Sequence, residues 1–231
     1  MKKSLTVLVP AYNEEKNLLD AVNSLLKILK KNVKDYEILI FDDHSTDSTG
    51  KIADLLALKD KKIRVFHNKK NRGMGYNYLK GIQFASKEYY TLFPGDNEND
   101  SDYFGKMLDQ IGKADIILSY TLNQEVRSFK RRFLSKTYVF ILNKLFNLDL
   151  RYYNGNSIFK TDMLRKIKVS SEGFAYSTEI LIRLIRRGSS YIQFGVKIKP
   201  TQKSSAFKIK NVLSVFKTIF HLFCEDMLGR L

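Results

Sequence analysis

The sequence predicts an α/β fold, with a mostly parallel β-sheet flanked by helices, and two observations support this prediction. Along the first half of the 231-residue chain, short apolar runs rich in β-branched residues alternate with amphipathic stretches. Such runs are typical of strands buried on both faces, and amphipathic stretches are typical of the helices that cover them. The connections are short, which favours parallel strands joined by helices. With 44% hydrophobic residues, the chain can bury one large core.

Each element is expected where the period of the apolar pattern changes. Five apolar runs are expected to form strands, at residues 5–10, 36–43, 63–67, 89–94 and 115–119. Four helices are expected between them, at residues 15–31, 46–58, 74–86 and 102–112. The first helix carries Leu18, Val22, Leu25 and Leu29 at spacings that place them on one face.

The second half of the chain alternates less regularly. We expect a long basic amphipathic helix at 126–147, a loop and strand at 151–160, a helix at 176–187 and a strand at 190–200. After a lysine-bearing loop, a further amphipathic helix carries apolar residues over 212–223.

Composition narrows the class of protein. The formal net charge of +16 fits three kinds of partner: nucleic acid, an anionic membrane face or a phosphorylated substrate. The sequence has no zinc-finger spacing and no RNA-binding aromatic motif, so we expect no nucleic-acid partner. The single cysteine, Cys224, cannot form an internal disulfide and fits a reducing, cytoplasmic setting. No window reaches the roughly 18–20 apolar residues of a membrane span, so membrane contact is expected to be peripheral.

Polar clusters follow the first four predicted strands. They are PAYNEE at 10–15, DDHSTDSTG at 42–50, NKKNRGMG at 68–75 and PGDNEND at 94–100. The carboxyl ends of parallel strands meet at one edge of a sheet, so these clusters are expected to form a cleft. The simpler explanation is that strand-to-helix loops are commonly polar. A loop in so basic a chain would ordinarily hold lysine rather than these carboxylates, and we therefore favour a binding cleft.

The segments VPAYNEEKNL and DDHSTDSTG, with the loop at 94–98, resemble family 2 glycosyltransferases, which have the GT-A fold. Within that family the chain most resembles the branch of polyprenyl-phosphate (dolichyl-phosphate) mannosyl- and glucosyltransferases, because NRGMGYNYLKGIQFA and NGNSIFK are also similar to segments of that branch. The resemblance covers roughly residues 4–200. It implies a Rossmann-like sheet and transfer of a sugar from a nucleoside diphosphate to an acceptor, with inversion and usually with Mg²⁺ or Mn²⁺.

By this resemblance, four residues after the first strand line the nucleotide pocket: Pro10, Ala11, Tyr12 and Glu14. The Tyr12 ring can stack beside a base, and the Glu14 carboxylate can accept a hydrogen bond from a ribose or base. Pro10 is expected to end the strand, since it cannot donate to a ladder. The alternative is a strand end followed by a helix cap, with Asn13 as the cap.

Asp42 and Asp43 are adjacent, so their side chains point to opposite sides of an extended chain. The resemblance implies that an acid here binds the base or ribose. We assign that role to Asp42 and expect Asp43 to brace the loop. Asp47 is expected to complement the N-terminus of the next helix. In the glycine-rich segment, Arg72 is expected either to contact the nucleotide or to face solvent, and both interpretations stay open.

The loop at 94–100 is the predicted metal site. The branch usually has Asp-x-Asp here; Pro94 stands in place of the first acid, Asp96 takes the place of the second and Glu98 that of a further contact. On an extended chain Asp96 and Glu98 point the same way, and their oxygens, with those of a diphosphate, suit Mg²⁺ or Mn²⁺. The metal would neutralise charge on the leaving diphosphate, which makes Asp96 a predicted catalytic residue. The alternative is an Asx-rich turn.

Two further predictions concern phosphate binding and the acceptor. At least two of Arg127, Arg131 and Arg132 are expected to share a helical face, most of all Arg127 and Arg131. By the resemblance this basic segment binds the donor diphosphate or the acceptor phosphate, and the alternative is a solvated basic face. Glu179 stands where relatives that use hydroxyl acceptors keep a catalytic base. A lipid phosphate is already an anion and needs no base, whereas a sugar hydroxyl must lose a proton. The alternative for Glu179 is an ordinary helix carboxylate near Arg183.

The expected protein is an inverting hexosyltransferase that uses a UDP- or GDP-sugar and a polyprenyl phosphate at the cytoplasmic face of the cell membrane. Its domain would span 1–202, with a nucleotide-binding half at 1–120 and an acceptor-binding half at 121–202. The amphipathic segment at 203–231 would lie on the membrane surface or pack on the core. Two alternatives stay open: a transferase to a saccharide hydroxyl in surface polysaccharide synthesis, and a non-catalytic basic binding protein, which the missing first acid favours.

Overall fold

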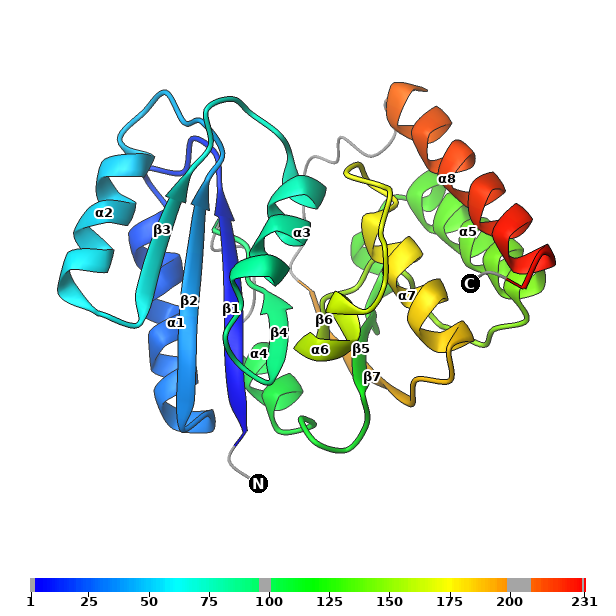
Figure 1. Ribbon diagram of the computed structural model, residues 1–231, viewed down its shortest axis with the longest axis horizontal. Helices are drawn as coiled ribbons and strands as arrows, with labels where there is room; N and C mark the ends of the chain where they lie inside the picture. Colours follow the sequence, from blue (N-terminus) through cyan, green and yellow to red (C-terminus); the bar gives the residue numbers. More distant parts are fainter. Residues whose placement is uncertain (1–2, 96–100, 199–208, 230) are drawn as a thin grey trace.

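The computed structural model describes residues 3–95, 101–198, 209–229 and 231. Within them the chain forms one seven-stranded sheet in the order β3-β2-β1-β4-β6-β5-β7 (Figure 1). The strands are β1 (Ser4–Ala11), β2 (Asp35–Asp42), β3 (Ile63–His67), β4 (Tyr89–Leu92), β5 (Ile116–Thr121), β6 (Ser157–Lys160) and β7 (Tyr191–Val196). The helices are α1 (Leu18–Asn32), α2 (Thr49–Lys59), α3 (Met74–Phe84), α4 (Ser101–Leu108), the 3-10 helix η1 (Gln124–Val126), α5 (Phe129–Phe146), α6 (Thr161–Arg165), α7 (Tyr176–Arg186) and α8 (Ile209–Met227).

Neighbouring strands are parallel except at β6. β1 pairs with β2 and β4, β2 with β3, and β5 with β7, all in parallel. β6 runs antiparallel between β4 and β5, with Ile158 opposite Thr91 on one side and Ile117 on the other. The prediction of a mostly parallel sheet flanked by helices is confirmed. Because β6 runs the other way, its start meets the ends of β4 and β5 at one edge of the sheet.

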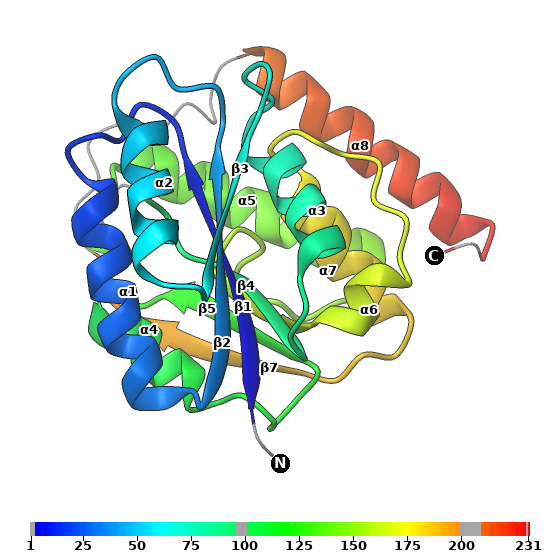
Figure 2. The same ribbon diagram turned by 60° about the vertical axis from the view of Figure 1, so that its left-hand side comes forward.

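Helices cover both faces of the sheet (Figure 2). Leu5, Val7 and Val9 of β1 belong to the core formed with α1, α2 and α4, whereas Leu8 belongs to the core formed with α3 and α7. Side chains alternate across a strand, so a strand covered on both sides needs apolar residues at every position. This burial explains the uninterrupted apolar runs in the sequence.

Two helices begin later than the sequence pattern predicts. α1 begins at Leu18, and Asn13 is not its cap: Asn13 has a left-handed φ of 55°, and its side chain is bonded to the next loop instead. α5 begins at Phe129 rather than at residue 126. Residues 124–126 form the separate 3-10 helix η1, and the Ser128 hydroxyl caps α5 by accepting a hydrogen bond from the Arg131 amide.

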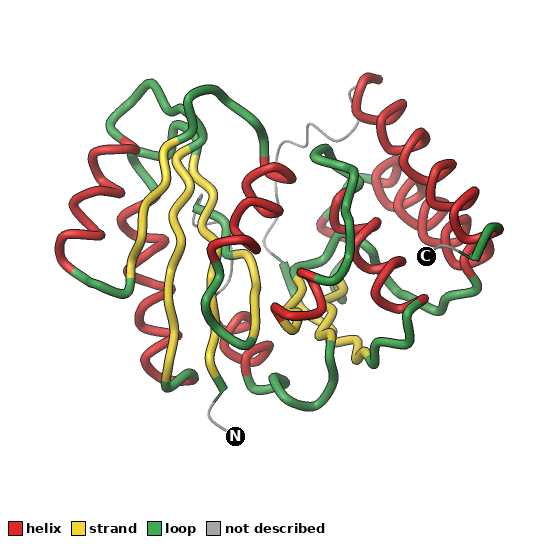
Figure 3. The backbone as a smooth tube through the Cα atoms, in the orientation of Figure 1, coloured by secondary structure: helices red, strands yellow, loops and turns green. Residues whose placement is uncertain are grey.

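The C-terminal helix α8 packs on α5 and α7 and lies alongside α5 (Figure 3). Its inner residues Ile219 and Leu222 are buried in the core. Its last residues form two ion pairs with α7, Glu225–Arg183 at 2.6 Å and Asp226–Arg186 at 2.8 Å. Across the described ranges, no helix has both the length and the apolarity to span a bilayer.

Candidate active site

The loops that follow β1 and β2 are tied together at the edge of the sheet. The Asn13 side chain accepts a hydrogen bond from the Thr46 amide at 2.9 Å, and the Asn13 amide donates to Ser45 Oγ at 3.0 Å. The Glu14 amide donates to Thr49 Oγ1 at 2.7 Å. These bonds hold the first two predicted nucleotide loops side by side.

Of the residues predicted to line the nucleotide pocket, Tyr12 and Glu14 lie on the first of these loops, whereas Pro10 and Ala11 are the last two residues of β1. The prediction that Pro10 ends the strand is wrong by one residue, since Ala11 still pairs with Asp42 of β2. Tyr12 is 48% exposed, so its ring is accessible to a ligand. Pro10 and Glu14 are half-buried, and the Glu14 carboxylate accepts a hydrogen bond from the Asn17 side chain at 2.8 Å. Ala11 is buried beneath the loop. The structure brings the four residues to one edge, and their contact with a nucleotide stays a prediction.

Asp42 and Asp43 are both buried, and their side chains bond to different segments of the chain. Asp42 accepts from the Ser45 amide at 3.0 Å, and its other oxygen lies 2.9 Å from His67 Nδ1. Asp43 accepts from two consecutive amides of the glycine-rich loop, at 2.8 and 2.7 Å. The second of these belongs to Gly73, whose φ of 82° favours glycine. Asp43 therefore braces the glycine-rich loop, and both Asp42 oxygens are also bonded within the protein.

His67 lies between two carboxylates. Its Nδ1 is 2.9 Å from Asp42 Oδ2 and its Nε2 is 3.0 Å from Asp54 Oδ1. The hydrogen bond to Asp42 raises the pKa of His67 against the opposing effect of burial, and Asp54 adds to the increase. Burial raises the pKa of Asp42, but hydrogen bonds from Ser45 and His67 outweigh it, so the Asp42 pKa is lowered. Protonated His67 is thus stabilised by its hydrogen bonds to Asp42 and Asp54.

We expect the His67→Gln variant to lose stability chiefly at acidic pH. Because the His67 pKa is higher in the folded state, its contribution is fully present below the unfolded value of about 6.5 and is lost as pH rises through the folded value. Urea unfolding in acidic and alkaline buffers should give the larger wild-type-to-variant difference in unfolding free energy in the acidic buffer. Equal differences in both buffers would contradict this expectation.

Arg72 does not simply face solvent. Its guanidinium donates to Glu172 Oε2 at 3.0 Å and lies 4.1 Å from the centroid of the Tyr76 ring. These contacts join the glycine-rich loop to the loop that precedes α7. Contact of Arg72 with a nucleotide stays a prediction.

The predicted metal ligands Asp96 and Glu98 lie outside the described residues. The chain approaches them beside the first nucleotide loop, since a Cβ placed on Gly95 would lie 3.1 Å from the Pro10 carbonyl oxygen. Elsewhere, the described residues contain no group of three or more His, Cys, Asp or Glu side chains that could hold a metal ion. The metal prediction therefore depends on Asp96 and Glu98, whose oxygen chemistry suits Mg²⁺ or Mn²⁺.

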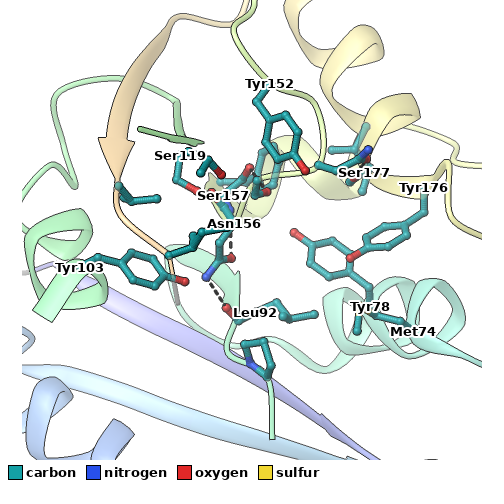
Figure 4. A pocket seen from close by; sticks show the side chains of 18 of the residues that line it. Met74, Tyr78, Leu92, Tyr103, Ser119, Tyr152, Asn156, Ser157, Tyr176 and Ser177 are labelled. Carbon is teal, nitrogen blue, oxygen red and sulfur yellow. Dashed lines mark hydrogen bonds between the residues drawn. The ribbon is translucent and has the colours of Figure 1, made fainter. Parts of the chain in front are cut away.

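A cavity of about 280 Å³ opens at the same edge of the sheet, beside Pro94 (Figure 4). Its wall comes from α3, α4, α7, β6, the ends of β4, β5 and β7, and the segments that carry Pro94, Arg127, Tyr152 and Ile198. Aromatic and small polar side chains are prominent in this tyrosine-lined cavity: Tyr78, Tyr103, Tyr152, Tyr176, Ser119, Asn154, Asn156, Ser157 and Ser177. The Asn156 side chain donates to the Leu92 carbonyl at 2.9 Å and so fixes the segment before β6 to the end of β4.

Arg127 is the only charged side chain in the described lining of this cavity. It donates to the Tyr152 hydroxyl at 3.2 Å, and its guanidinium carbon lies 5.3 Å from the ring centroid. Its Nε is buried with no hydrogen-bond partner in the described part of the chain, and so is the Tyr78 hydroxyl. Buried polar groups are normally paired, and both of these unpaired atoms belong to residues that line the cavity.

Residues 6–169 match the model of glycosyl transferase family 2. The chain belongs to this family. The glycosyltransferase GlyG of Streptococcus pneumoniae is 30% identical over 127 residues, which are 54% of this chain and 41% of that protein, so the match spans less than half of GlyG. The polyprenol monophosphomannose synthase of Mycolicibacterium smegmatis is 28% identical over 81% of this chain and 74% of that protein. The undecaprenyl-phosphate mannosyltransferase of Micrococcus luteus is 22% identical over 80% of this chain and 79% of that protein.

Solved structures share the fold of this glycosyltransferase. The mannosyl-3-phosphoglycerate synthase of Rubrobacter xylanophilus superposes with a TM-score of 0.72 at 13% identity, over 99% of this chain and 76% of that one. The glucosyl-3-phosphoglycerate synthase of Mycobacterium tuberculosis, in complex with Mn²⁺, UDP and phosphoglyceric acid, superposes with a TM-score of 0.70 at 15% identity, over 96% and 78%. The predicted family, the GT-A fold and the resemblance to the polyprenyl-phosphate branch are confirmed.

Glu179 of this glycosyltransferase is a buried carboxylate. Its side chain is 0% exposed, and it accepts from the amides of Ser170 and Ser171 at 3.0 and 2.9 Å and from Arg183 Nε at 2.9 Å. A general base must reach the proton that it removes, and this carboxylate is enclosed by its partners. These contacts favour the alternative, a helix carboxylate paired with Arg183, and the catalytic-base role of Glu179 stays a prediction.

Arg127 and Arg131 of this glycosyltransferase do not share a helical face. Arg127 precedes α5 in extended backbone, with φ −102° and ψ 149°, because Ser128 is the helix cap. Of the two arginines, Arg127 alone lines the tyrosine-lined cavity. The expected pairing is therefore wrong, and phosphate binding by either arginine stays a prediction.

The aromatic lining of the glycosyltransferase cavity is not evident in the sequence. Tyr78, Tyr152 and Tyr176 come from α3, the segment before β6 and α7, and no local spacing connects them. The available signal is the segment 151–160, in which two asparagines and a glycine stand directly before a strand. Such residues often shape a ligand-facing turn, but the strand partners that place the turn lie far away in the sequence.

Proposed function

We propose that this glycosyltransferase transfers a hexose from a UDP- or GDP-sugar to a polyprenyl phosphate, with inversion, at the cytoplasmic face of the cell membrane. One observation supports a phosphate as the acceptor: the described lining of the tyrosine-lined cavity holds Arg127 and no Asp, Glu or His. A phosphate oxygen is already an anion, so it benefits from an arginine and needs no base. The relatives named for polyprenol and undecaprenyl phosphate support the same acceptor.

Transfer is a single in-line displacement. An oxygen of the acceptor phosphate attacks the anomeric carbon while the bond from that carbon to the leaving diphosphate oxygen breaks, which inverts the configuration. Arg127 holds the attacking phosphate in the cavity, and Tyr12, Glu14 and Asp42 hold the base and ribose at the neighbouring loops. In this arrangement residues 1–120 supply the nucleotide side, and residues 121–202 supply most of the acceptor side.

The donor side suits a divalent cation. We assign Mg²⁺ or Mn²⁺ to Asp96 and Glu98, and when bound the ion supplies positive charge for the leaving diphosphate. The described start of this loop, Gly95, lies against Pro10, and this proximity to the predicted nucleotide loop supports the assignment. A protein of similar fold, solved with Mn²⁺ and UDP, supports the assignment.

Thermal unfolding tests the donor and the metal together. A nucleoside-diphosphate sugar at about 100 times its Kd should stabilise the protein by about 2.7 kcal/mol, a rise in melting temperature of roughly 5–10 °C for a domain of this size. The rise should require Mn²⁺ or Mg²⁺, and comparison of UDP- with GDP-sugars identifies the base. Asp96→Asn should lose the metal dependence, while Asp162→Asn, at an 83% exposed carboxylate on α6, should keep it. No rise with any donor would favour a non-catalytic basic binding protein.

Transfer of label from the sugar of the donor tests the acceptor. Undecaprenyl phosphate in detergent micelles and a panel of saccharides are offered in parallel. We expect the label in the lipid fraction, from which mild acid should release it, since a glycosyl phosphate bond is acid-labile. Label on a saccharide instead would overturn the lipid-phosphate proposal in favour of the hydroxyl-acceptor alternative.

A further inference from the structure

The helix α5 is apolar on both of its sides. Its inner side buries Leu142 and Phe146 in the core. Its outer side exposes six large apolar side chains, Phe129, Phe133, Leu134, Phe140, Ile141 and Leu145. A surface helix ordinarily presents a polar outer side. An exposed apolar face of this size marks an interaction site.

The helix α8, which packs on α5, has a similar outer side. Leu213, Phe216 and Phe220 are 64%, 63% and 70% exposed, at spacings that align them on one helical face. Among the described residues, all five phenylalanines that are more than 60% exposed lie on these two helices. The outer sides of α5 and α8 together are called the docking surface below.

The charges on these helices identify the partner. α5 contains five basic residues and no acidic one: Lys130, Arg131, Arg132, Lys136 and Lys144. The two acids of α8, Glu225 and Asp226, stand at its end and are paired with arginines of α7. A second copy of this chain would oppose like charges across a twofold axis. An anionic bilayer offers phosphates to the cations and acyl chains to the phenylalanines, and we infer that the docking surface binds an anionic lipid membrane.

The docking surface begins at the tyrosine-lined cavity. Arg127 lines the cavity and Phe129, which starts α5, follows two residues later; two residues of chain span at most about 7 Å. Near the start of α8, Ser214 Oγ lies 3.4 Å from a Cβ placed on Gly173, in the loop that leads to the cavity residue Tyr176. The start of α5 and the first turns of α8 therefore lie near chain segments that line the cavity.

A membrane on the docking surface brings lipid phosphates to the level of Arg127. A polyprenyl phosphate could then present its phosphate to the cavity while its chain stays in the bilayer. This delivery route rests on the proposed function, since it matters only for a lipid acceptor, whereas membrane binding does not depend on it.

Vesicle co-sedimentation without donor or acceptor tests the docking surface. Wild type should bind phosphatidylcholine vesicles that contain phosphatidylglycerol, and more weakly those that lack it. Phe133→Ser with Phe140→Ser should weaken binding about tenfold or more, because two phenylalanines no longer enter the apolar region. The matched control is Leu55→Ser with Leu58→Ser on α2, which are 56% and 82% exposed and should leave binding unchanged.

A double variant that removes two lysines of α5 measures the electrostatic contribution to membrane binding. Lys136→Gln with Lys144→Gln should weaken binding to the anionic vesicles and leave binding to the neutral ones unchanged. Lys27→Gln with Lys30→Gln, two exposed lysines of α1, is the control and should bind as wild type does.

Two outcomes would overturn the inference: wild type that binds neither kind of vesicle, or a Phe133/Phe140 double variant that binds as well as wild type. Light scattering that shows a wild-type dimer, a monomeric variant and no vesicle binding would assign the surface to a second copy instead. Failure of the proposed function would appear in an activity assay and not in the vesicle-binding assay. On a water-soluble, short-chain prenyl phosphate the double variant should be as active as wild type, and absence of transfer by wild type there would reject the acceptor proposal while leaving the vesicle result intact.

Discussion

An Arg127→Ala enzyme is expected to use a lipid phosphate acceptor about 100-fold less efficiently than wild type, measured as kcat/KM. Arg127 is the only charged side chain in the described cavity lining, and its buried Nε lacks a partner there. Removing one preorganised donor from such a site costs roughly 10²–10³-fold, and the smaller loss applies because the hydroxyls and amides of the cavity stay in place. Arg127→Lys should recover only part of the activity, since a lysine lacks the planar, forked guanidinium that binds phosphate oxygens bidentately.

Arg151→Ala is the matched control for this experiment. Arg151 donates to the Tyr120 hydroxyl at 2.8 Å and lies 4.8 Å from the ring centroid, the same arrangement as Arg127 with Tyr152, yet neither residue lines the cavity. Its kcat/KM should stay close to that of wild type. Both variants should keep the donor-induced rise in melting temperature. Equal losses of activity in the two variants would show that a surface arginine, rather than the cavity, accounts for the effect.

Replacing Glu179 by alanine is expected to lower the free energy of unfolding by about 3 kcal/mol. Removal of one partner from a buried ion pair costs roughly 3–5 kcal/mol, because the other charge stays buried without compensation. The lower end applies here because Arg183, which is 5% exposed, keeps Glu225 at 2.6 Å. The amides of Ser170 and Ser171 also lose their acceptor. Urea unfolding monitored by circular dichroism measures the loss.

Asp162→Ala provides the comparison at an exposed ion pair. Asp162 lies 3.6 Å from Arg165 and is 83% exposed, so the expected loss is below about 1 kcal/mol. The Glu179→Gln variant distinguishes structure from catalysis. A structural carboxylate predicts reduced stability with activity retained by the folded molecules. A Glu179→Gln protein that is as stable as wild type but inactive would restore the catalytic-base hypothesis.

The strands of this fold are predictable from the sequence because both faces of each central strand are covered. The apolar runs at 5–10 and 36–43 match β1 and β2 to within one residue. Helix starts are harder to predict because tertiary contacts decide them. Asn13 has the chemistry of a cap, yet it bonds to Thr46, 33 residues later. Ser128 does cap α5, and by doing so it removes Arg127 from the helical face that the spacing predicts.

The candidate site, like the fold, has one part that the sequence predicts and one part that depends on tertiary contacts. The predicted nucleotide-binding residues at 10–14 are contiguous, so they lie together wherever the carboxyl end of β1 is placed. The tyrosine-lined cavity is assembled from strands and helices far apart in the sequence, and the Arg127–Tyr152 contact cannot be inferred from either segment alone. Burial of Glu179 is likewise a tertiary property, because its amide partners come from the loop before α7 rather than from the helix itself.

During synthesis, β5 emerges from the ribosome before either of the two strands with which it pairs. It ends at Thr121, and its neighbours in the described sheet are β6 and β7, which end at Lys160 and Val196. Until those residues emerge, β5 and the outer edge of β4 present unpaired amides and carbonyls, while β1 to β4 can already pair with one another. Synthesis therefore completes β1 to β4 first, and a nascent chain in which β5 has emerged without β6 and β7 would expose both edges of β5 and one edge of β4 and be prone to aggregate.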